Sequence, residues 1–127
     1  RDMPRVMVVD DVAETRAILG DMLREMGFST VIEAADGLDA LEKLKQERAH
    51  LILCDHRMER MSGLDLLSQL RNHPYLVDIP FIVVSAVSEG PVIENALDLG
   101  ADDYLLKPIG FSKLKDCVGE VLRRRCA

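Results

Sequence analysis

Five polar residues follow the ends of four short apolar runs, and their side chains are of the types that bind metals and phosphate. They are Asp10, Asp11, Asp55, Ser85 and Lys107. Carboxylates brought together without compensation repel one another, and a divalent cation relieves that repulsion. All-oxygen ligands select a hard ion, and Mg²⁺ commonly uses one or two carboxylates together with water and phosphate.

The same side chains could take part in the transfer of a phosphoryl group. Lys107 adds a positive charge, and Ser85 adds a hydroxyl that can donate to an oxyanion. A metal ion, a cation, a hydrogen-bond donor and a nucleophile are the parts that phosphoryl transfer uses, and an Asp can accept the group as an acyl phosphate. Each residue alone is more simply explained as a helix cap or a turn residue. Their coincidence at four strand ends favours a site.

The elements that would position these residues are strands and helices in alternation. Apolar runs predict strands at 6–9, 51–54, 81–84 and 104–106, with a weaker strand at 29–34 that we expect at an edge. Apolar residues that recur every three or four positions predict five helices. The residues on their apolar faces are Ile18, Leu19, Met22, Leu23 and Met26; Leu38, Leu41 and Leu44; Leu64, Leu67 and Leu70; Val92, Ile93, Ala96 and Leu97; and Leu114, Cys117, Val118, Val121 and Leu122.

Signals at the predicted helix ends support this pattern. Gly27 and Gly100 follow apolar stripes, as glycine does beyond a helix end. The segment 62–65 resembles a capping box with Asp in place of Glu, and Pro91 suits a first helical turn.

Alternation with short connections predicts one α/β domain with a mostly parallel sheet covered by helices on both faces. The carboxyl ends of its strands then meet at one edge, where ligands bind in open sheets of this class. The five polar residues would gather there.

Composition limits the function further. The chain has 127 residues, of which 48% are hydrophobic and 30% charged, and its net charge of -6 argues against a nucleic-acid-binding surface. No apolar stretch could span a bilayer and no signal peptide is present, so we expect a cytoplasmic protein without membrane contact.

The first residue is not Met, which suggests a fragment of a longer protein. Residues 123–127 are expected to be a last helical turn, a tail or the start of a linker.

Three cysteines without metal-like spacing make a disulfide scaffold unexpected and suggest a reducing compartment. Cys54 and Cys117 lie on apolar faces and are interpreted as core thiols. Cys126 is expected to be a free thiol in the tail.

Five segments carry a resemblance to the receiver domains of response regulators, the CheY-like family, over about residues 5–122. They are Val8-Val9-Asp10-Asp11, Leu53-Cys54-Asp55-His56-Arg57-Met58, Met61-Ser62-Gly63-Leu64, Val84-Ser85-Ala86 and Gly100-Ala101-Asp102-Asp103-Tyr104-Leu105-Leu106-Lys107-Pro108. The resemblance implies a flavodoxin-like (βα)5 sandwich whose five parallel strands run in the order 2-1-3-4-5. It also implies a role in two-component signal transduction and phosphorelay.

The resemblance implies that Asp55 accepts a phosphoryl group from the phosphohistidine of a sensor histidine kinase or a histidine phosphotransfer protein. Lys107 would contact that group, Ser85 would follow it by hydrogen bonding, and Tyr104 would be the aromatic switch that turns inward. The changed surface would lie around the fourth helix, fifth strand and fifth helix, and would regulate an output domain or a partner. The Lys107-Pro108 bond would be cis.

The resemblance also implies a Mg²⁺ site, with Mn²⁺ able to substitute. Its ligands would be Asp11, Asp55 and the backbone carbonyl of Arg57, with Asp10 reaching the ion at least through water. The domain would phosphorylate and dephosphorylate itself with the metal but would not be an enzyme. A homodimer that forms on phosphorylation is left open.

Three residues beside the expected site depart from the family pattern or vary in it. Glu59 stands where a Pro often follows Met58, which suggests a more mobile loop. Arg57 could reach the phosphate, although a solvated side chain is expected, and Val87 could shield the site from water. Ser85 in place of Thr keeps the hydroxyl.

Three other classes of protein share part of this residue pattern. A phosphatase of the haloacid dehalogenase class shares the residue types, but the segment 55–57 lacks its second acid. A flavodoxin-like FMN binder needs a phosphate loop after the first strand, where 10–14 is acidic instead. A receiver-like module that no longer takes phosphate would not need all five site residues.

Overall fold

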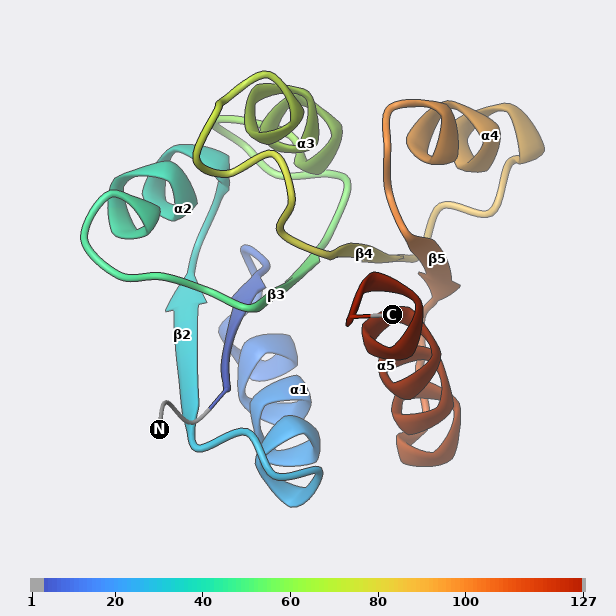
Figure 1. Ribbon diagram of the computed structural model, residues 1–127. Coiled ribbons are helices and arrows are strands. Elements are labelled where there is room, and N and C mark those ends of the chain that lie inside the picture. Colours follow the sequence, from blue (N-terminus) through green and yellow to red (C-terminus); the bar gives the residue numbers. More distant parts are fainter. Residues whose placement is uncertain (1–3, 127) are drawn as a thin grey trace.

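The computed structural model describes residues 4–126, with side chains to residue 125, so the expectation for the Cys126 thiol lies outside the described side chains. Strands and helices alternate five times (Figure 1). The elements are β1 (Arg5–Val9), α1 (Ala13–Glu25), β2 (Thr30–Ala34), α2 (Gly37–Leu44), β3 (Leu51–Cys54), α3 (Gly63–Arg71), β4 (Phe81–Ser85), α4 (Gly90–Asp98), β5 (Asp103–Leu106) and α5 (Phe111–Cys126). All neighbouring strands are parallel, in the order β2-β1-β3-β4-β5, which confirms the predicted fold.

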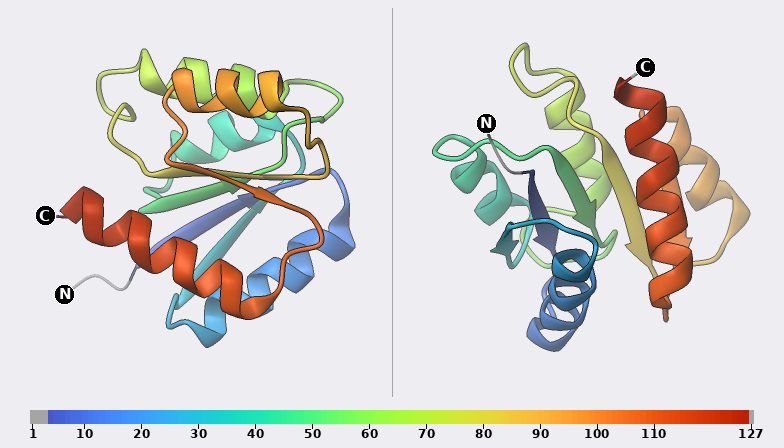
Figure 2. Two further views of the ribbon diagram at one scale, coloured as in Figure 1. Left: turned by 90° about the vertical axis from the view of Figure 1, so that its right-hand side faces the viewer. Right: turned by 60° about the horizontal axis from the view of Figure 1, so that its bottom comes forward.

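The sheet is the middle of three layers, with α1 and α5 on one face and α2, α3 and α4 on the other (Figure 2). Side chains that alternate along β1 divide between the two cores. Val6 and Val8 pack with α1 and α5, whereas Met7 and Val9 pack with the opposite layer. Burying each such side chain contributes about 1.5–3 kcal/mol, so both faces of the central strands hold the fold together.

Helix ends follow the predicted signals. The Ser62 hydroxyl accepts a hydrogen bond from the Asp65 amide at 3.1 Å and caps α3. Gly27 and Gly100 have φ angles of 110° and 111°, which favour glycine, after α1 and α4. None of the helices between residues 4 and 126 combines the length and hydropathy that crossing a bilayer requires.

Three apolar residues expected on buried helix faces are exposed instead. Ile18, Leu38 and Leu97 are 56%, 43% and 45% exposed. Each helix covers the sheet in a single layer, so only a narrow stripe reaches the core. In α1 that stripe is centred on Leu19 and Leu23, and its exposed flank carries Ile18.

A polar network joins α3, α5 and the start of β4 near residue 102. The Asp102 carboxylate accepts hydrogen bonds from the Phe81 amide at 2.8 Å, Arg71 at 3.4 Å and Arg125 at 3.2 Å. Arg71 also donates to the carbonyls of Gly100 and Ile79, at 2.8 Å in each case. Burial lowers the pKa of Arg71 and the charge of Asp102 opposes that effect. The last turn of α5, with its arginines, is therefore fastened to the body of the domain.

We expect Asp102→Ala to destabilise the fold by about 3 kcal/mol, because it leaves a largely buried Arg71 and a strand amide without their acceptor. The free energy of unfolding in urea measures the loss. Asp98→Ala removes an exposed carboxylate and serves as the charge-matched control, with an expected change within about 0.5 kcal/mol. Equal stability of the two variants would show that the network contributes nothing.

Candidate phosphoacceptor site

The ammonium group of Lys107 contacts carboxylates that follow two other strands, β1 and β3. Lys107, which follows β5, places its Nζ 2.8 Å from Asp10 Oδ2 and 3.2 Å from Asp55 Oδ2. Its backbone amide donates to the Ser85 carbonyl at 2.9 Å, so the pairing of β4 with β5 fixes the position of the Lys107 backbone. The Lys107-Pro108 peptide is cis, as expected. The structure thus brings together residues 97 and 52 positions apart in the chain.

The three carboxylates form a compact acidic cluster. Asp10, Asp11 and Asp55 each offer an oxygen within 4.8 Å of the others, the one such group of potential metal ligands in the described part of the chain. Asp10 is 1% exposed and accepts from the Val12 amide at 2.9 Å, and Asp55 accepts from the His56 amide at 2.7 Å. Three carboxylates against one ammonium leave an excess of negative charge and an all-oxygen donor set, which fits a hard divalent cation.

The protonation state of Lys107 follows from its neighbours. Burial alone would lower its pKa, but the hydrogen bond to Asp10 and the charges of Asp55 and Asp10 outweigh burial, so the pKa is raised. The side chain is therefore a fixed cation beside Asp55 at neutral pH.

Ser85 and Tyr104 are connected through the backbone of Val87. Ser85 ends β4 and is 1% exposed, and its oxygen accepts from the Val87 amide at 3.2 Å. The half-buried Tyr104 donates its hydroxyl hydrogen to the Val87 carbonyl at 2.7 Å. The apolar side chain of Val87 carried no signal of this link, because the link uses only its peptide groups.

A cavity of about 290 Å³ opens beside Asp55. It is lined by Asp55, Arg57, Ser85, Ala86, Val87, Ser88, Glu89 and Lys107. Arg57 is exposed, in agreement with the expected solvated side chain. Ser88 and Glu89, which precede α4, also contribute to the wall.

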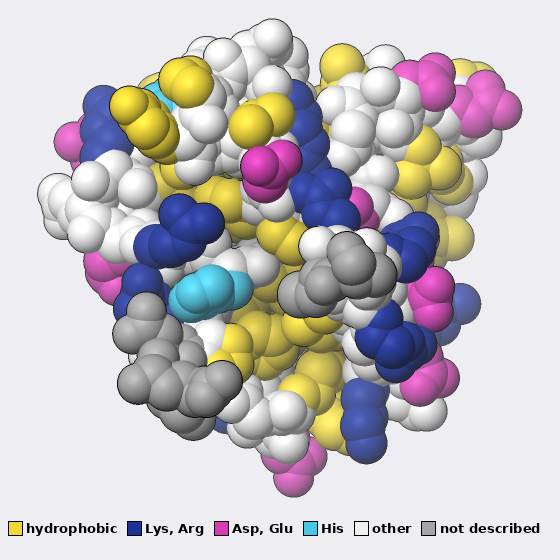
Figure 3. Space-filling view, in the orientation of Figure 1, with side chains coloured by type: hydrophobic (Ala, Val, Ile, Leu, Met, Phe, Trp, Pro, Cys, Tyr) yellow, Lys and Arg dark blue, Asp and Glu magenta, His cyan; other side chains and the backbone are white. Residues whose placement is uncertain are grey.

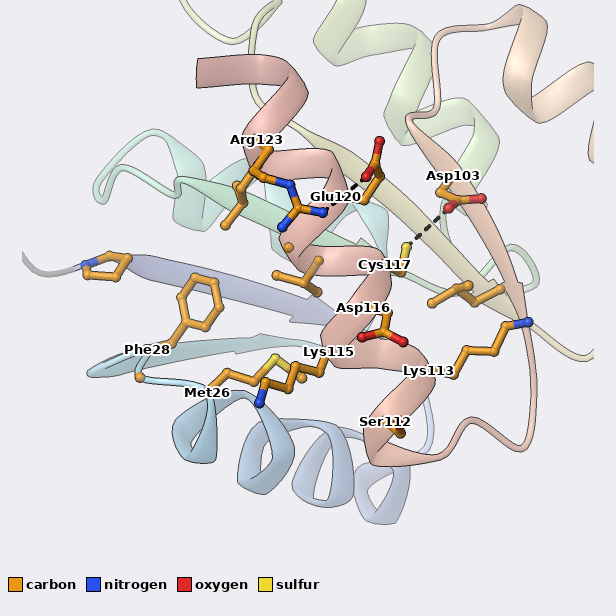
Figure 4. Close-up of a pocket in the computed structure, with 16 residues that line it drawn as sticks. Met26, Phe28, Asp103, Ser112, Lys113, Lys115, Asp116, Cys117, Glu120 and Arg123 are labelled. Carbon is orange, nitrogen blue, oxygen red and sulfur yellow. Dashed lines mark hydrogen bonds and ion pairs between the residues drawn. The ribbon is translucent and has the colours of Figure 1, made fainter. Parts of the chain in front are cut away.

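A larger groove, of about 1080 Å³, lies between α5 and residues 26–28, which follow α1, and it does not reach the acidic cluster. Figure 3 shows apolar side chains along this seam, with Lys and Arg side chains beside α5. Two of its acids are paired: Glu120 with Arg123 at 3.1 Å, and Asp103, which accepts from Cys117 at 3.2 Å (Figure 4). The smaller cavity is the one that reaches both Asp55 and Lys107.

Both described cysteines are buried, as predicted. Burial, followed by the nearby charges of Asp55 and Asp10, holds the pKa of Cys54 well above its usual value. Burial and the hydrogen bond to Asp103 raise the pKa of Cys117 to about 12.

We expect both thiols to resist iodoacetamide in the folded protein at about pH 8, because the thiolate is the reacting species. Peptide mass mapping before and after unfolding in guanidinium measures the labelling. Labelling of Cys117 in the native state at the rate of the unfolded control would contradict this burial.

Comparison with known proteins gives the family. The family model of the response regulator receiver domain matches residues 6–119. The chain therefore belongs to the response regulator receiver domain family of two-component signalling.

Relatives carry this domain in different settings. The chain is 32% identical to the chemotaxis protein CheY-3 of Vibrio cholerae over 94% of its own length and 92% of the relative. It is 37% identical to the probable transcriptional regulator ycf27 of Porphyridium aerugineum, over 94% of its length but 48% of that longer protein. The receiver domain of a histidine kinase from Syntrophus aciditrophicus superposes with a TM-score of 0.85 at 29% identity, covering 94% of this chain and 90% of that one.

Proposed function

We propose that Asp55 accepts a phosphoryl group from the phosphohistidine of a histidine kinase or a histidine phosphotransfer protein. The observation that carries this proposal is the position of Lys107, which contacts both Asp10 and Asp55 beside a cavity that reaches Asp55. In the transfer a carboxylate oxygen of Asp55 forms a bond to phosphorus while the bond from phosphorus to the histidine nitrogen breaks. The imidazole leaves with that electron pair.

Each neighbouring residue has a task in this proposal. Asp10, Asp11, Asp55 and the carbonyl of Arg57 would hold Mg²⁺, which supplies charge neutralisation of the phosphoryl oxygens. Lys107 orients Asp55 before the transfer and offsets the charge of the phosphoryl group afterwards.

The switch would begin at Ser85. Its hydroxyl hydrogen is free to donate to a phosphoryl oxygen, because the Ser85 oxygen is the acceptor of the Val87 amide. A shift of Ser85 would move Val87 and, through the Val87 carbonyl, Tyr104. The surface of α4, β5 and α5 would then change for an output domain or a partner protein, as two states of a pre-existing equilibrium.

The domain would take one phosphoryl group per molecule and would not turn over phosphate esters as an enzyme. This separates it from a phosphatase of the haloacid dehalogenase class, which has the same residue types. Incubation with p-nitrophenyl phosphate and Mg²⁺ is expected to release no more nitrophenol than a control without protein. Sustained release would favour the phosphatase.

The test of the proposal is intact mass after incubation with phosphoramidate and Mg²⁺. We expect the mass of one added phosphoryl group, absent when EDTA removes the metal. Folded protein that gains no such mass, beside a receiver domain that does, would contradict the proposal. A beryllofluoride-induced spectral change detects an adduct that hydrolyses too quickly for mass measurement.

A further inference from the structure

The loop between β3 and α3 is attached to the start of α2 by an ion pair. Arg60 donates through Nε to Asp36 Oδ2 at 2.7 Å and through Nη2 to Asp36 Oδ1 at 3.3 Å. Asp36 is 7% exposed and also caps α2 by accepting from the Asp39 amide at 2.9 Å. One buried carboxylate therefore serves both the helix and the loop. The hydrogen bond from Arg60 also lowers the pKa of Asp36, so the carboxylate is charged at neutral pH.

The backbones meet closely beside this pair. The Gly37 amide donates to the Met61 carbonyl at 3.2 Å. A Cβ on Gly37 would lie 2.6 Å from Met61 Cγ and 2.9 Å from the Met61 carbonyl oxygen, so the contact requires glycine. At the far end of the loop, the Gly63 amide donates to the His56 carbonyl at 2.8 Å.

These contacts hold the ends of the loop, and its centre lacks a stiff residue. Glu59 stands where a proline would restrict the backbone, and the exposed Arg57 makes no side-chain hydrogen bond or ion pair within the described residues. Met58 packs against the core next to Arg57, and Arg60 is the charged side chain that connects this part of the loop to a buried carboxylate.

We propose that the Arg60–Asp36 pair is a positioning device that holds the Arg57 carbonyl where a metal ligand is needed. The inference rests on the proposed function, since it concerns the same Mg²⁺ site. Arg60 lies three residues after Arg57 in the loop. Fixing Arg60 limits the places that the Arg57 carbonyl can occupy. The ion pair takes over the restraint that a proline at position 59 would provide.

Positioning and simple electrostatics predict opposite results for Arg60→Gln. Removing a positive charge from the loop that follows Asp55 would by charge alone tighten Mg²⁺ binding. Loss of positioning instead weakens it, and we expect about tenfold lower affinity, the lower end of the effect of removing a group that orients a ligand. Mg²⁺ titration followed by amide NMR shifts measures the affinity.

Asp36→Asn is the second variant, because Asn keeps the cap of α2 while losing the charge that holds Arg60. We expect the same weakening from it, and no further loss in the double variant, since both changes break one pair. Arg123→Gln, which removes an exposed ion pair on α5, is the matched control and leaves the affinity unchanged. Amide hydrogen exchange of residues 57–61 in metal-free protein is expected to speed up in the first two variants only.

The outcomes separate the two proposals. A parent protein that binds no Mg²⁺ and takes no phosphoryl group would overturn the proposed function and this inference with it. A parent that binds Mg²⁺, with Arg60→Gln binding equally or more tightly, would overturn the inference alone.

Discussion

Asp55→Asn is expected to abolish the phosphoryl adduct while leaving the fold intact. The amide oxygen of Asn can still accept from the His56 amide, which binds Asp55 Oδ1 at 2.7 Å. The amide nitrogen of Asn replaces Oδ2, so only the contact with Lys107 at 3.2 Å is lost. A neutral amide lacks the carboxylate charge that attacks phosphorus, so the acyl phosphate cannot form. Intact mass after phosphoramidate and Mg²⁺ measures the yield, and near-UV and far-UV circular dichroism check the fold.

The control for this experiment is Asp98→Asn, which neutralises an exposed carboxylate on α4 and should phosphorylate like the parent. An adduct that persists in Asp55→Asn at the parent yield would show that another residue accepts the phosphoryl group. Asp10 is a poor candidate, because it is 1% exposed and bound to both Lys107 and the Val12 amide.

Asp11→Asn is expected to lower the affinity for Mg²⁺ by at least about tenfold, and to slow phosphorylation at limiting metal in proportion. Asp11 is exposed and makes no hydrogen bond or ion pair through its side chain in the described structure, so its replacement disturbs no packing. Removing one of three like charges should leave the metal-free protein at least as stable as the parent. Affinity and stability therefore move independently.

Calorimetric titration with MgCl₂ gives the affinity, and urea unfolding with EDTA gives the stability of the metal-free protein. Glu14→Gln, an exposed acid in the first turn of α1, controls for the general loss of negative charge. Unchanged Mg²⁺ affinity in Asp11→Asn would remove Asp11 from the ligand set.

The assembly of the site followed from the sequence because parallel strands carry their carboxyl ends to one edge. Asp55, Ser85 and Lys107 each follow a short apolar run, and the parallel pairing of the strands places the three residues at the same edge of the sheet. The Mg²⁺ ligand set and the switch were expected from resemblance, and they remain predictions.

Contacts between side chains far apart in the chain were not predictable in the same way. The Arg60–Asp36 and Arg71–Asp102 pairs join charged residues of a type usually found at the surface, and no periodic spacing connects their positions in the sequence. Val87 links Ser85 to Tyr104 through peptide groups that every residue has. Hydrophobic spacing also overestimated burial, since it placed Leu97 on the covered side of α4, where Ala96 alone is buried.

Borohydride reduction of the phosphorylated protein tests the role of Asp55 most directly. An aspartyl phosphate is a mixed anhydride, which borohydride reduces to homoserine, so peptide mass mapping locates the acceptor. We predict homoserine at position 55 only, in protein treated with phosphoramidate and Mg²⁺, and none when EDTA is present. Homoserine at Asp10 or Asp11, or its absence from a phosphorylated sample, would contradict the assignment of Asp55 as the phosphoacceptor.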